Sequence, residues 1–416
     1  MAHFLTAGGG TGNYTNSQLD TALRAGSASV GCRFDVLDQT LNYLGQLSYV
    51  SSATVDMDPT RLIPGGLRLT MLPDPLLPIA TTTPFTRLIR PWFRMRMPDG
   101  GVAEWPCGVF VWTKPTETLQ GVNGITTWDV QLGDQTHLLV LGGPGREGFS
   151  VPTNQALTTV INTVLQLALP YAPSLAGVTQ SSTLSAGPLS WNLLTSQQPQ
   201  AKPSGGIGDQ IVGGSGAPAT SWASILQVLH GSLGYMPGYF DWLGVYQARP
   251  MPPNLFSQPA AVLFYANATG IIESGVTSTP NLSNVANWVM VIANNANSNA
   301  MQSYAIADAD ILLPGHPYSH AKTGEYYRII VSDGAAGDQQ TLMARATSEL
   351  YIRLAGATDL AMSTHAWPTI EPWDVVGFQL PTDPTYDTAR NLLSKGWSMD
   401  LFTGLMAHKL SRITGT

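Results

Sequence analysis

The sequence predicts a mainly β fold with an α+β insert, in which two β-barrel or β-sandwich domains flank a small α/β domain. In the first and last parts of the chain, apolar and polar residues alternate with a period of two, between breaks rich in Gly, Pro, Asn and Asp. In the middle part, the apolar spacing changes to the three- and four-residue repeat of amphipathic helices. With 416 residues, the chain is long enough for more than one domain.

An N-terminal arm is expected over residues 1–27, where a run of three glycines precedes a short helical stretch at 17–24. The first β domain is expected over 28–145. Its strands are predicted around residues 33–36, 67–71, 92–97 and 126–132. The turns between them carry Pro-Gly, Asp-Gly and Asn-Gly pairs, which favour chain reversal.

The α/β domain is expected over 146–257. One helix is indicated by Leu157, Val160, Ile161 and Val164, after Thr153 as a capping candidate, and it should stop near Pro170. A second helix is indicated by Trp222, Ile225, Leu226 and Leu229, with Ser221 as its N-cap. The Ser-, Gly- and Pro-rich stretch 171–220 between them predicts a long loop, and residues 241–244 predict the turn of a hairpin.

The second β domain is expected over 258–416. Its strand candidates are residues 262–265, 288–292, 326–331 and 375–380. One inserted helix is predicted at 339–355, and Met343, Ala346, Leu350 and Leu354 are expected to form its apolar stripe.

Charged residues make up only 11% of the chain, against about 25% in typical soluble domains. Its net charge of −7 argues against a dedicated nucleic-acid binder. A surface with so few charges suits burial against partner subunits. The two cysteines, Cys32 and Cys107, are expected to be free buried thiols. We expect neither a signal peptide nor a transmembrane helix, and folding in a cytoplasm.

Catalytic and metal-binding signatures are weak, so we expect no enzyme, no cofactor and no metal. The sequence contains no phosphate-binding loop motif and no HExxH or GxSxG motif, and residues 213–216 (GGSG) only approach the last of these. His316 and His320 are four residues apart, but Pro317 favours a loop over a helix that would place both on one metal. Asp308 and Asp310 lack the Gly and Glu of a calcium loop.

One basic cluster, formed by Arg87, Arg90, Arg94 and Arg96, is the candidate interface. Its members could form the polar face of a strand. Alternatively, they could bind acidic residues of a partner, since the planar guanidinium pairs well with carboxylates. A DNA contact is the third interpretation.

Several short motifs, taken in order, resemble the siphophage minor tail proteins of the baseplate-hub (tail-hub) family. In the first β domain they are RFDVLD (33–38), LRLTML (67–72), RPW (90–92) and WPCGVF (105–110). In the insert they are SWASIL (221–226), YFD (239–241) and QARP (247–250). Near the end they are YRII (327–330) and WPTIEPWDVV (367–376). The resemblance spans about residues 30–380, but 180–220 has no counterpart, and Trp373 stands where the family usually has Gly.

The resemblance implies a trimeric hub similar to the centre of contractile-tail baseplates, with two tail-tube-like β domains in each subunit. Such a homotrimer would dock on the distal tail protein ring, carry tail fibre or tip proteins, and line a channel for the tape measure protein and for DNA in transit. The expected location is the tail tip of the virion. Two other functions are weighed: a receptor- or carbohydrate-binding protein of the fibre or tip, and a cell-wall hydrolase.

Overall fold

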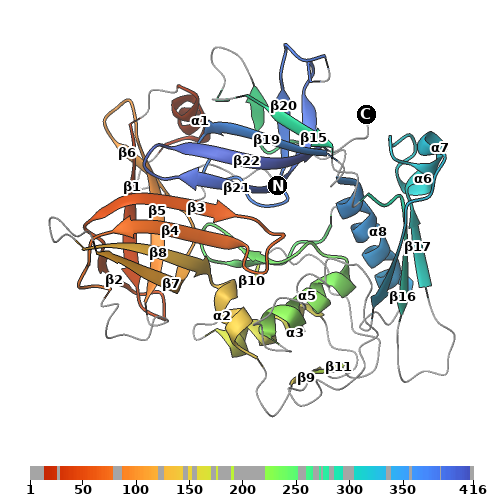
Figure 1. Cartoon of the computed structure of the whole chain (residues 1–416), viewed down its shortest axis with the longest axis horizontal. Helices are drawn as coiled ribbons and strands as arrows, with labels where there is room; N and C mark the ends of the chain where they lie inside the picture. The colour runs from red at the N-terminus through yellow and green to blue at the C-terminus, as the bar shows by residue number, and fades with distance from the viewer. Residues whose placement is uncertain are drawn as a thin grey trace.

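The structure is a computed structural model (Figure 1). It describes residues 14–25, 29–77, 87–119, 126–143, 149–151, 157–169, 175–176, 189–191, 221–251, 259–265, 271–272, 275–280, 285–293, 304–333, 339–355, 358–384 and 386–412. Strands dominate these residues, so the predicted mainly β class is confirmed.

The largest element is one 14-stranded sheet built from both ends of the chain. The N-terminal part contributes β1 (Val30–Leu37), β2 (Tyr43–Gln46), β3 (Val50–Met57), β4 (Gly65–Met71), β5 (Leu88–Arg96), β6 (Val102–Pro106), β7 (Phe110–Leu119) and β8 (Thr126–Asp134). The C-terminal part contributes β14 (Leu263–Tyr265), β15 (Thr277–Pro280), β19 (Thr358–His365), β20 (Val375–Gln379), β21 (Arg390–Asp400) and β22 (Leu405–Arg412).

The two parts of this sheet meet where β21 pairs antiparallel with β3. Trp397 lies opposite Met57 and Asp400 lies opposite Thr54. The main path is β15-β19-β22-β21-β3-β4-β8-β7-β5-β1-β2, and in the described part of the chain it does not close into a barrel. One hydrophobic core runs beneath both parts. Alternation along a sequence indicates strands but not their partners, so this shared sheet could not be read from the sequence. The division into domains at 145 and 257 stays a prediction.

The insert is helical where the periodicity predicts helices. It contains α2 (Thr136–Leu141), α3 (Leu157–Ala168) and α5 (Trp222–Leu233). Val160, Ile161 and Val164 of α3 are buried, as are Ile225 and Leu229 of α5. The predicted N-cap is confirmed, because the Ser221 side chain accepts a hydrogen bond from the Ser224 backbone N–H. The predicted cap at Thr153 lies outside the described residues.

Short strands complete the insert. The predicted hairpin is confirmed as β12 (Tyr239–Phe240) and β13 (Tyr246–Gln247), which pair antiparallel. Within the predicted loop 171–220, Leu175–Ala176 (β10) pairs with β13 and Leu189–Trp191 (β11) pairs with β9 (Phe149–Val151). The rest of that loop lies outside the described residues.

A second small α/β unit lies inside the predicted second β domain and was not foreseen. Its three-stranded sheet has the order β17 (Tyr304–Asp308), β16 (Trp288–Ala293), β18 (Arg328–Asp333). The helix α8 (Gln339–Ala355) covers one face of this sheet and separates it from the rest of the molecule (Figure 1). Two short helices, α6 (Ala309–Leu312) and α7 (His320–Thr323), precede β18.

The predicted apolar stripe of α8 is wrong at one position. Ala346, Leu350 and Leu354 are buried, but the fourth buried member is Leu342, and Met343 is 40% exposed. Steps of four residues keep Leu342 on the same face as the other three, whereas Met343 is turned by about 100° from it. The bounds of the helix are those predicted from the sequence.

The described part of the predicted N-terminal arm packs on the chain itself. Helix α1 (Asn16–Arg24) buries Leu19 and Leu23 in the large core. The guanidinium of Arg24 lies 5.3 Å from the centre of the Trp367 ring, in the C-terminal part. This helix therefore contacts the C-terminal part of the chain. Residues 1–13 of the predicted arm lie outside the described residues.

Candidate functional site

The arginines singled out in the sequence lie on or beside β5. Arg90, Arg94 and Arg96 alternate with the buried Phe93 and Met95, so the three arginines share the outer face of the strand. Arg87 precedes the strand and is half-buried. The structure therefore brings three of the four candidates onto one face.

The side chain of Arg94 is held by the fold itself. Its Nε lies 2.6 Å from Glu104 Oε1 on β6, and Arg33 Nη1 on β1 lies 3.2 Å from the other oxygen of Glu104. Since the Glu104 side chain is only 5% exposed, these two guanidiniums neutralise a buried carboxylate. The polar-face interpretation therefore describes Arg94.

The neighbouring part of this face is also internally paired. The guanidinium of Arg33 lies 4.7 Å from the centre of the Trp92 ring, and the Trp92 indole N–H donates to Asp35 at 2.7 Å. Arg96, by contrast, is exposed at the end of β5. A role in binding partners stays a prediction for Arg87, Arg90, Arg94 and Arg96.

A buried charged junction, formed by Tyr239, Arg249, Glu371 and Asp374, joins the insert to the C-terminal segment. The Tyr239 hydroxyl donates to Glu371 at 2.9 Å. Arg249 pairs with Glu371 and, at 3.3 Å, with Asp374. Burial raises the pKa of Tyr239 well above its ordinary value, and the Glu371 charge adds to the shift, so the phenol stays a hydrogen-bond donor.

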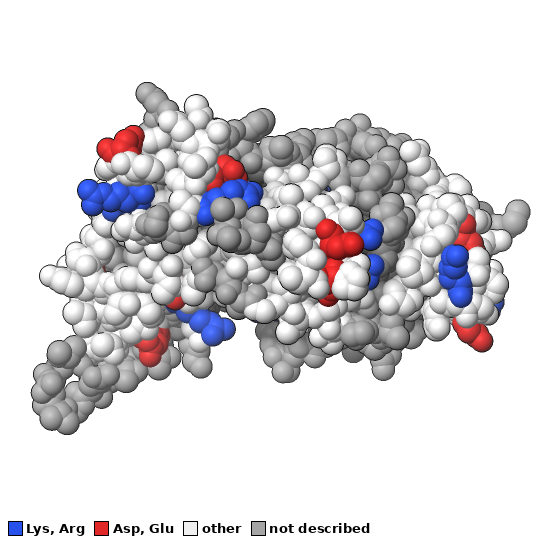
Figure 2. Space-filling view, turned by 90° about the horizontal axis from the view of Figure 1, so that it is seen from above, with Lys and Arg blue, Asp and Glu red and all other residues white. Residues whose placement is uncertain are grey.

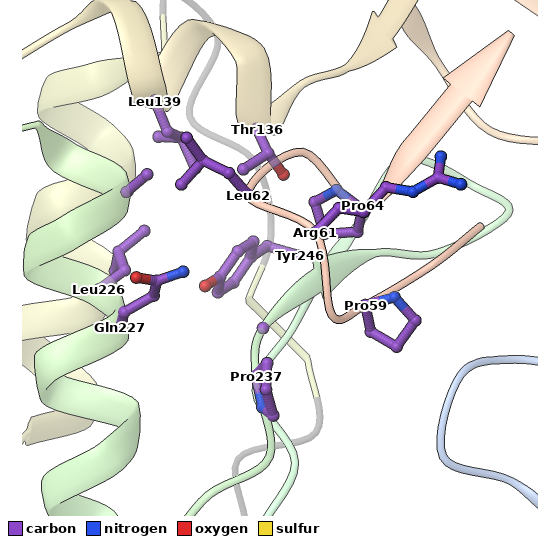
Figure 3. A pocket seen from close by; sticks show the side chains of 12 residues that line it. Pro59, Arg61, Leu62, Pro64, Thr136, Leu139, Leu226, Gln227, Pro237 and Tyr246 are labelled. Carbon is purple, nitrogen blue, oxygen red and sulfur yellow. The ribbon is translucent and has the colours of Figure 1, made fainter. Parts of the chain in front are cut away.

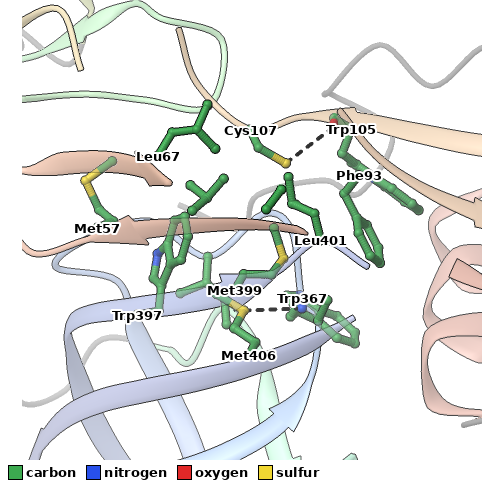
Figure 4. Close-up of a cluster of buried hydrophobic side chains, with 14 of the residues drawn as sticks. Met57, Leu67, Phe93, Trp105, Cys107, Trp367, Trp397, Met399, Leu401 and Met406 are labelled. Carbon is green, nitrogen blue, oxygen red and sulfur yellow. Dashed lines mark hydrogen bonds between the residues drawn. The ribbon is translucent and has the colours of Figure 1, made fainter. Parts of the chain in front are cut away.

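A stacked tryptophan pair lies beside this junction. The rings of Trp242, in the hairpin turn, and Trp397, on β21, are 4.4 Å apart at their centres and 3° from parallel. They line a small pocket together with Cys107 and Glu371. Figure 4 shows Trp397 and Met399 of β21 among core side chains of the N-terminal strands, such as Met57. The insert therefore meets the N-terminal and the C-terminal parts of the large sheet at this point.

Another pocket lies between the loop that follows β3 and the helices of the insert (Figure 3). Leu62, Pro64, Leu226 and Tyr246 line it. Of the described residues that line it, Arg61 alone carries a full charge, and it pairs with Asp56 and Asp58. This lining offers no acid–base pair for catalysis.

The histidines considered as metal ligands make other contacts. His316 is buried in a turn, where burial lowers its pKa to about 4, and its Nδ1 accepts the Tyr318 N–H at 3.2 Å. His320 begins α7 and stacks on Tyr326 at 3.9 Å. Asp308 caps α6. Within the described ranges, no three His, Cys, Asp or Glu side chains gather as metal ligands.

Both cysteines are free thiols, as expected, but only Cys107 is fully buried and Cys32 is half-buried. Burial raises the pKa of Cys32 to about 11 and that of Cys107 further. Raised pKa values keep both thiols protonated, and therefore poorly nucleophilic, at neutral pH. The GGSG stretch at 213–216 lies outside the described residues. No helix in the part of the chain that the structure describes is long and apolar enough to cross a membrane.

Comparison with known proteins identifies the fold. No family model and no curated protein matches the sequence. A tail protein from Neisseria meningitidis is similar in structure over 92% of this chain and 97% of its own length, with a TM-score of 0.59 at 10% sequence identity. The 43 kDa tail protein of prophage MuSo2 from Shewanella oneidensis is similar over 92% and 98%, with a TM-score of 0.56 at 11% identity. The chain has the fold of a phage tail protein.

A third structure with the tail-protein fold, a prophage tail protein from Listeria monocytogenes, matches 92% of this chain and 95% of its own, with a TM-score of 0.51 at 10% identity. The fold expected from the hub resemblance is thus confirmed. The motifs YFD, QARP and WPTIEPWDVV, which carried that resemblance, meet in space, because Tyr239, Arg249 and Glu371 all belong to the buried charged junction.

Sequence reasoning did not bring these residues together. Arg249 and Glu371 are 122 positions apart, and each was only one letter of a motif. The usable signal was the presence of isolated charges inside apolar motifs of a chain with few charges, because a buried charge requires a partner.

Proposed function

We propose that this chain is a structural subunit of a phage tail tip, a baseplate hub that acts by assembling and not by catalysis. Three copies form a ring that joins the distal tail ring to tip or fibre proteins. The lumen passes the tape measure protein and then DNA. The observation that carries the proposal is the tail-protein fold, which extends over nearly the whole chain and nearly the whole of each similar tail protein.

The surface supports a protein that works inside an assembly. Figure 2 shows isolated charged groups separated by wide uncharged areas. Large apolar side chains such as Tyr43, Tyr49 and Ile311 are more than 60% exposed. Contact with neighbouring subunits would cover such a surface, since the centres of protein interfaces are poor in charge and rich in aromatic residues.

The location of the chain in its particle tests the proposal. In a cryo-EM map of the parent virion we expect density for this chain at the tail tip, as a threefold ring below the tail tube. Finding it along the tube, in the head or at a fibre end would overturn the hub role. Purified chain that forms the ring should have a mass of about three times 44.4 kDa by light scattering.

Binding to acidic partners through the β5 arginines is tested by two charge variants. Arg96→Glu reverses an exposed charge, so it should weaken association with the distal tail ring without changing the melting temperature. Arg94→Ala leaves the buried Glu104 with Arg33 alone and should lower stability. If Arg96→Glu binds the ring as well as the original chain does, this face is only the polar side of a strand.

The alternatives make different predictions for the same purified protein. A cell-wall hydrolase would clear peptidoglycan in a zymogram, and a receptor-binding protein would retain glycans on an array. A hub subunit should do neither, and a positive result in either assay would replace the proposal.

A further inference from the structure

The strand β18 is an exposed edge with apolar side chains. Ile330 is 59% exposed, and Arg328 and Ser332 on the same face are also exposed. Ile329 and Val331, on the other face, are only half-buried, because α8 packs mainly against β16 and β17. Among the described strands, β18 pairs with β16 alone. A strand of this kind is a template for pairing with another chain, and stable proteins normally protect such an edge.

The opposite edge of the same sheet, β17, has matching side chains. The register places three cross-strand rows on the outer face, each read from β17 through β16 to β18: Asp308–Trp288–Arg328, Ile306–Met290–Ile330 and Tyr304–Ile292–Ser332. The first row has an acid at one edge and a base at the other, and the second has isoleucine at both edges. Arg328 contacts the rings of Trp288 and Tyr326 but has no carboxylate partner within the described ranges.

We propose that β18 of one copy pairs antiparallel with β17 of the next copy, so that the small sheets of neighbouring subunits become continuous. When the cross-strand rows of one subunit continue into those of the next, Arg328 faces Asp308 of the partner subunit and Ile330 faces Ile306 of the partner subunit. The strand directions agree, because β18 is parallel to β16 and β17 is antiparallel to it. This inference rests on the self-assembly in the proposed function and names the edges that make it.

Head-to-tail pairing fits the side chains better than a two-fold contact between two β18 strands. An antiparallel pair of β18 strands centred on Ile330 would place each Arg328 opposite a Ser332 and provide no opposite charge. Unlike edges also generate a closed ring when the rotation between subunits closes, whereas a two-fold contact stops at a dimer.

Disulfide cross-linking tests the register. Ile306→Cys and Ile330→Cys are introduced together, with Cys32→Ser in every variant. Within one subunit the two new cysteines are separated by β16, which places them about 10 Å apart, beyond the reach of a disulfide. Mild oxidation should therefore give only intermolecular links, ending in a covalent closed oligomer on a non-reducing gel.

The single cysteine variants provide the controls. Each alone should stay unlinked, and an equal mixture of the two should give a covalent dimer. If Ile330→Cys links to itself, β18 pairs with β18 and the head-to-tail inference is overturned. If the double variant remains uncross-linked, the inference is also overturned, whether the chain is trimeric or monomeric in solution.

A matched lysine pair tests the same edge without cysteine. Ile330→Lys and Leu167→Lys each change an aliphatic side chain that is 59% exposed, on β18 and α3 respectively. Ile330→Lys should raise the dissociation constant of the oligomer about tenfold or more, because the interface loses the apolar contact that the isoleucine side chain makes. Leu167→Lys should leave it unchanged, and equal effects would overturn the inference. The place of the chain in the virion tests the hub role separately, so the two failures are distinguishable.

Discussion

Trp242 and Trp397 stack almost in parallel, 4.4 Å apart, although one lies in the insert and the other on β21. The Trp242 indole N–H also donates to the Ile370 carbonyl at 3.1 Å. The hairpin turn of the insert is therefore attached to the C-terminal segment by stacking and by a hydrogen bond, next to the seam between β3 and β21.

The first prediction concerns this stack. Trp397→Ala should lower the free energy of unfolding by about 3–5 kcal/mol, the usual cost of removing a buried tryptophan. Combined with Trp242→Ala in a double-mutant cycle, the pair should show a coupling of about 0.5–1.5 kcal/mol. Denaturant unfolding of the four proteins measures this, and strictly additive effects would mean that the stack itself contributes nothing.

The second prediction concerns the buried charged junction. Arg249→Met removes the guanidinium that pairs with Glu371 and Asp374, and breaking a buried pair in this way typically costs about 3–5 kcal/mol. Adding Glu371→Gln removes one of the two carboxylate charges that Arg249 had neutralised, so the double variant should be more stable than Arg249→Met alone. A double variant that is less stable than the single would show that Glu371 does not depend on Arg249.

The third prediction concerns acid stability. Burial lowers the pKa of His230 to about 4 and that of His408 to about 3. Below pH 6.5 the unfolded chain binds protons that the folded chain does not. These residues therefore lower the free energy of unfolding as the pH falls from about 6.5 to 4. His408→Gln should reduce this loss of stability on acidification by at most about 1.4 kcal/mol for each pH unit.

An acid in the same pH window gives a control of opposite sign. Burial raises the pKa of Asp134 to about 7, so between about pH 4 and 7 the folded chain holds a proton that the unfolded chain has lost. Asp134 therefore adds stability as the pH falls, and Asp134→Asn should make the loss of stability on acidification steeper. Denaturant titrations at pH 7.5, 6 and 5 compare the slopes, and parallel curves for both variants would contradict these assignments.

The fourth prediction concerns Trp373, which stands where the hub family usually has glycine. Its φ of 69° is the left-handed conformation that glycine adopts freely, and its side chain packs with Tyr351 and Leu393. Both Trp373→Ala and Trp373→Gly lose this packing, but only glycine relieves the backbone strain of about 1–2 kcal/mol. Thermal melts should therefore rank Gly above Ala, and the reverse order would contradict the strain.

Local elements could be predicted because local sequence encodes them. The bounds of α8, the cap at Ser221 and the hairpin at 239–247 follow from periodicity, capping chemistry and turn residues within a few positions. The pairing of β21 with β3 and the separate sheet under α8 depend on contacts between distant segments, which no short window contains.

The candidate site divides in the same way. Alternation along β5 was enough to place Arg90, Arg94 and Arg96 on one face. It could not reveal that Glu104, on the neighbouring strand, neutralises Arg94, because the register of two strands is set by the turn and by the core. The buried junction was missed because its members come from three motifs, two in the insert and one near the end of the chain.

The β3–β21 seam has a consequence for synthesis. Residues 50–57 leave the ribosome long before 397–400 are made, and at about 5–20 residues per second the wait is on the order of tens of seconds. Throughout that time the N-terminal half has an unpaired strand edge, at which strands of other nascent chains can pair non-natively. Fragments truncated before residue 390 should therefore aggregate, and a separately supplied C-terminal segment that contains β21 should rescue their solubility.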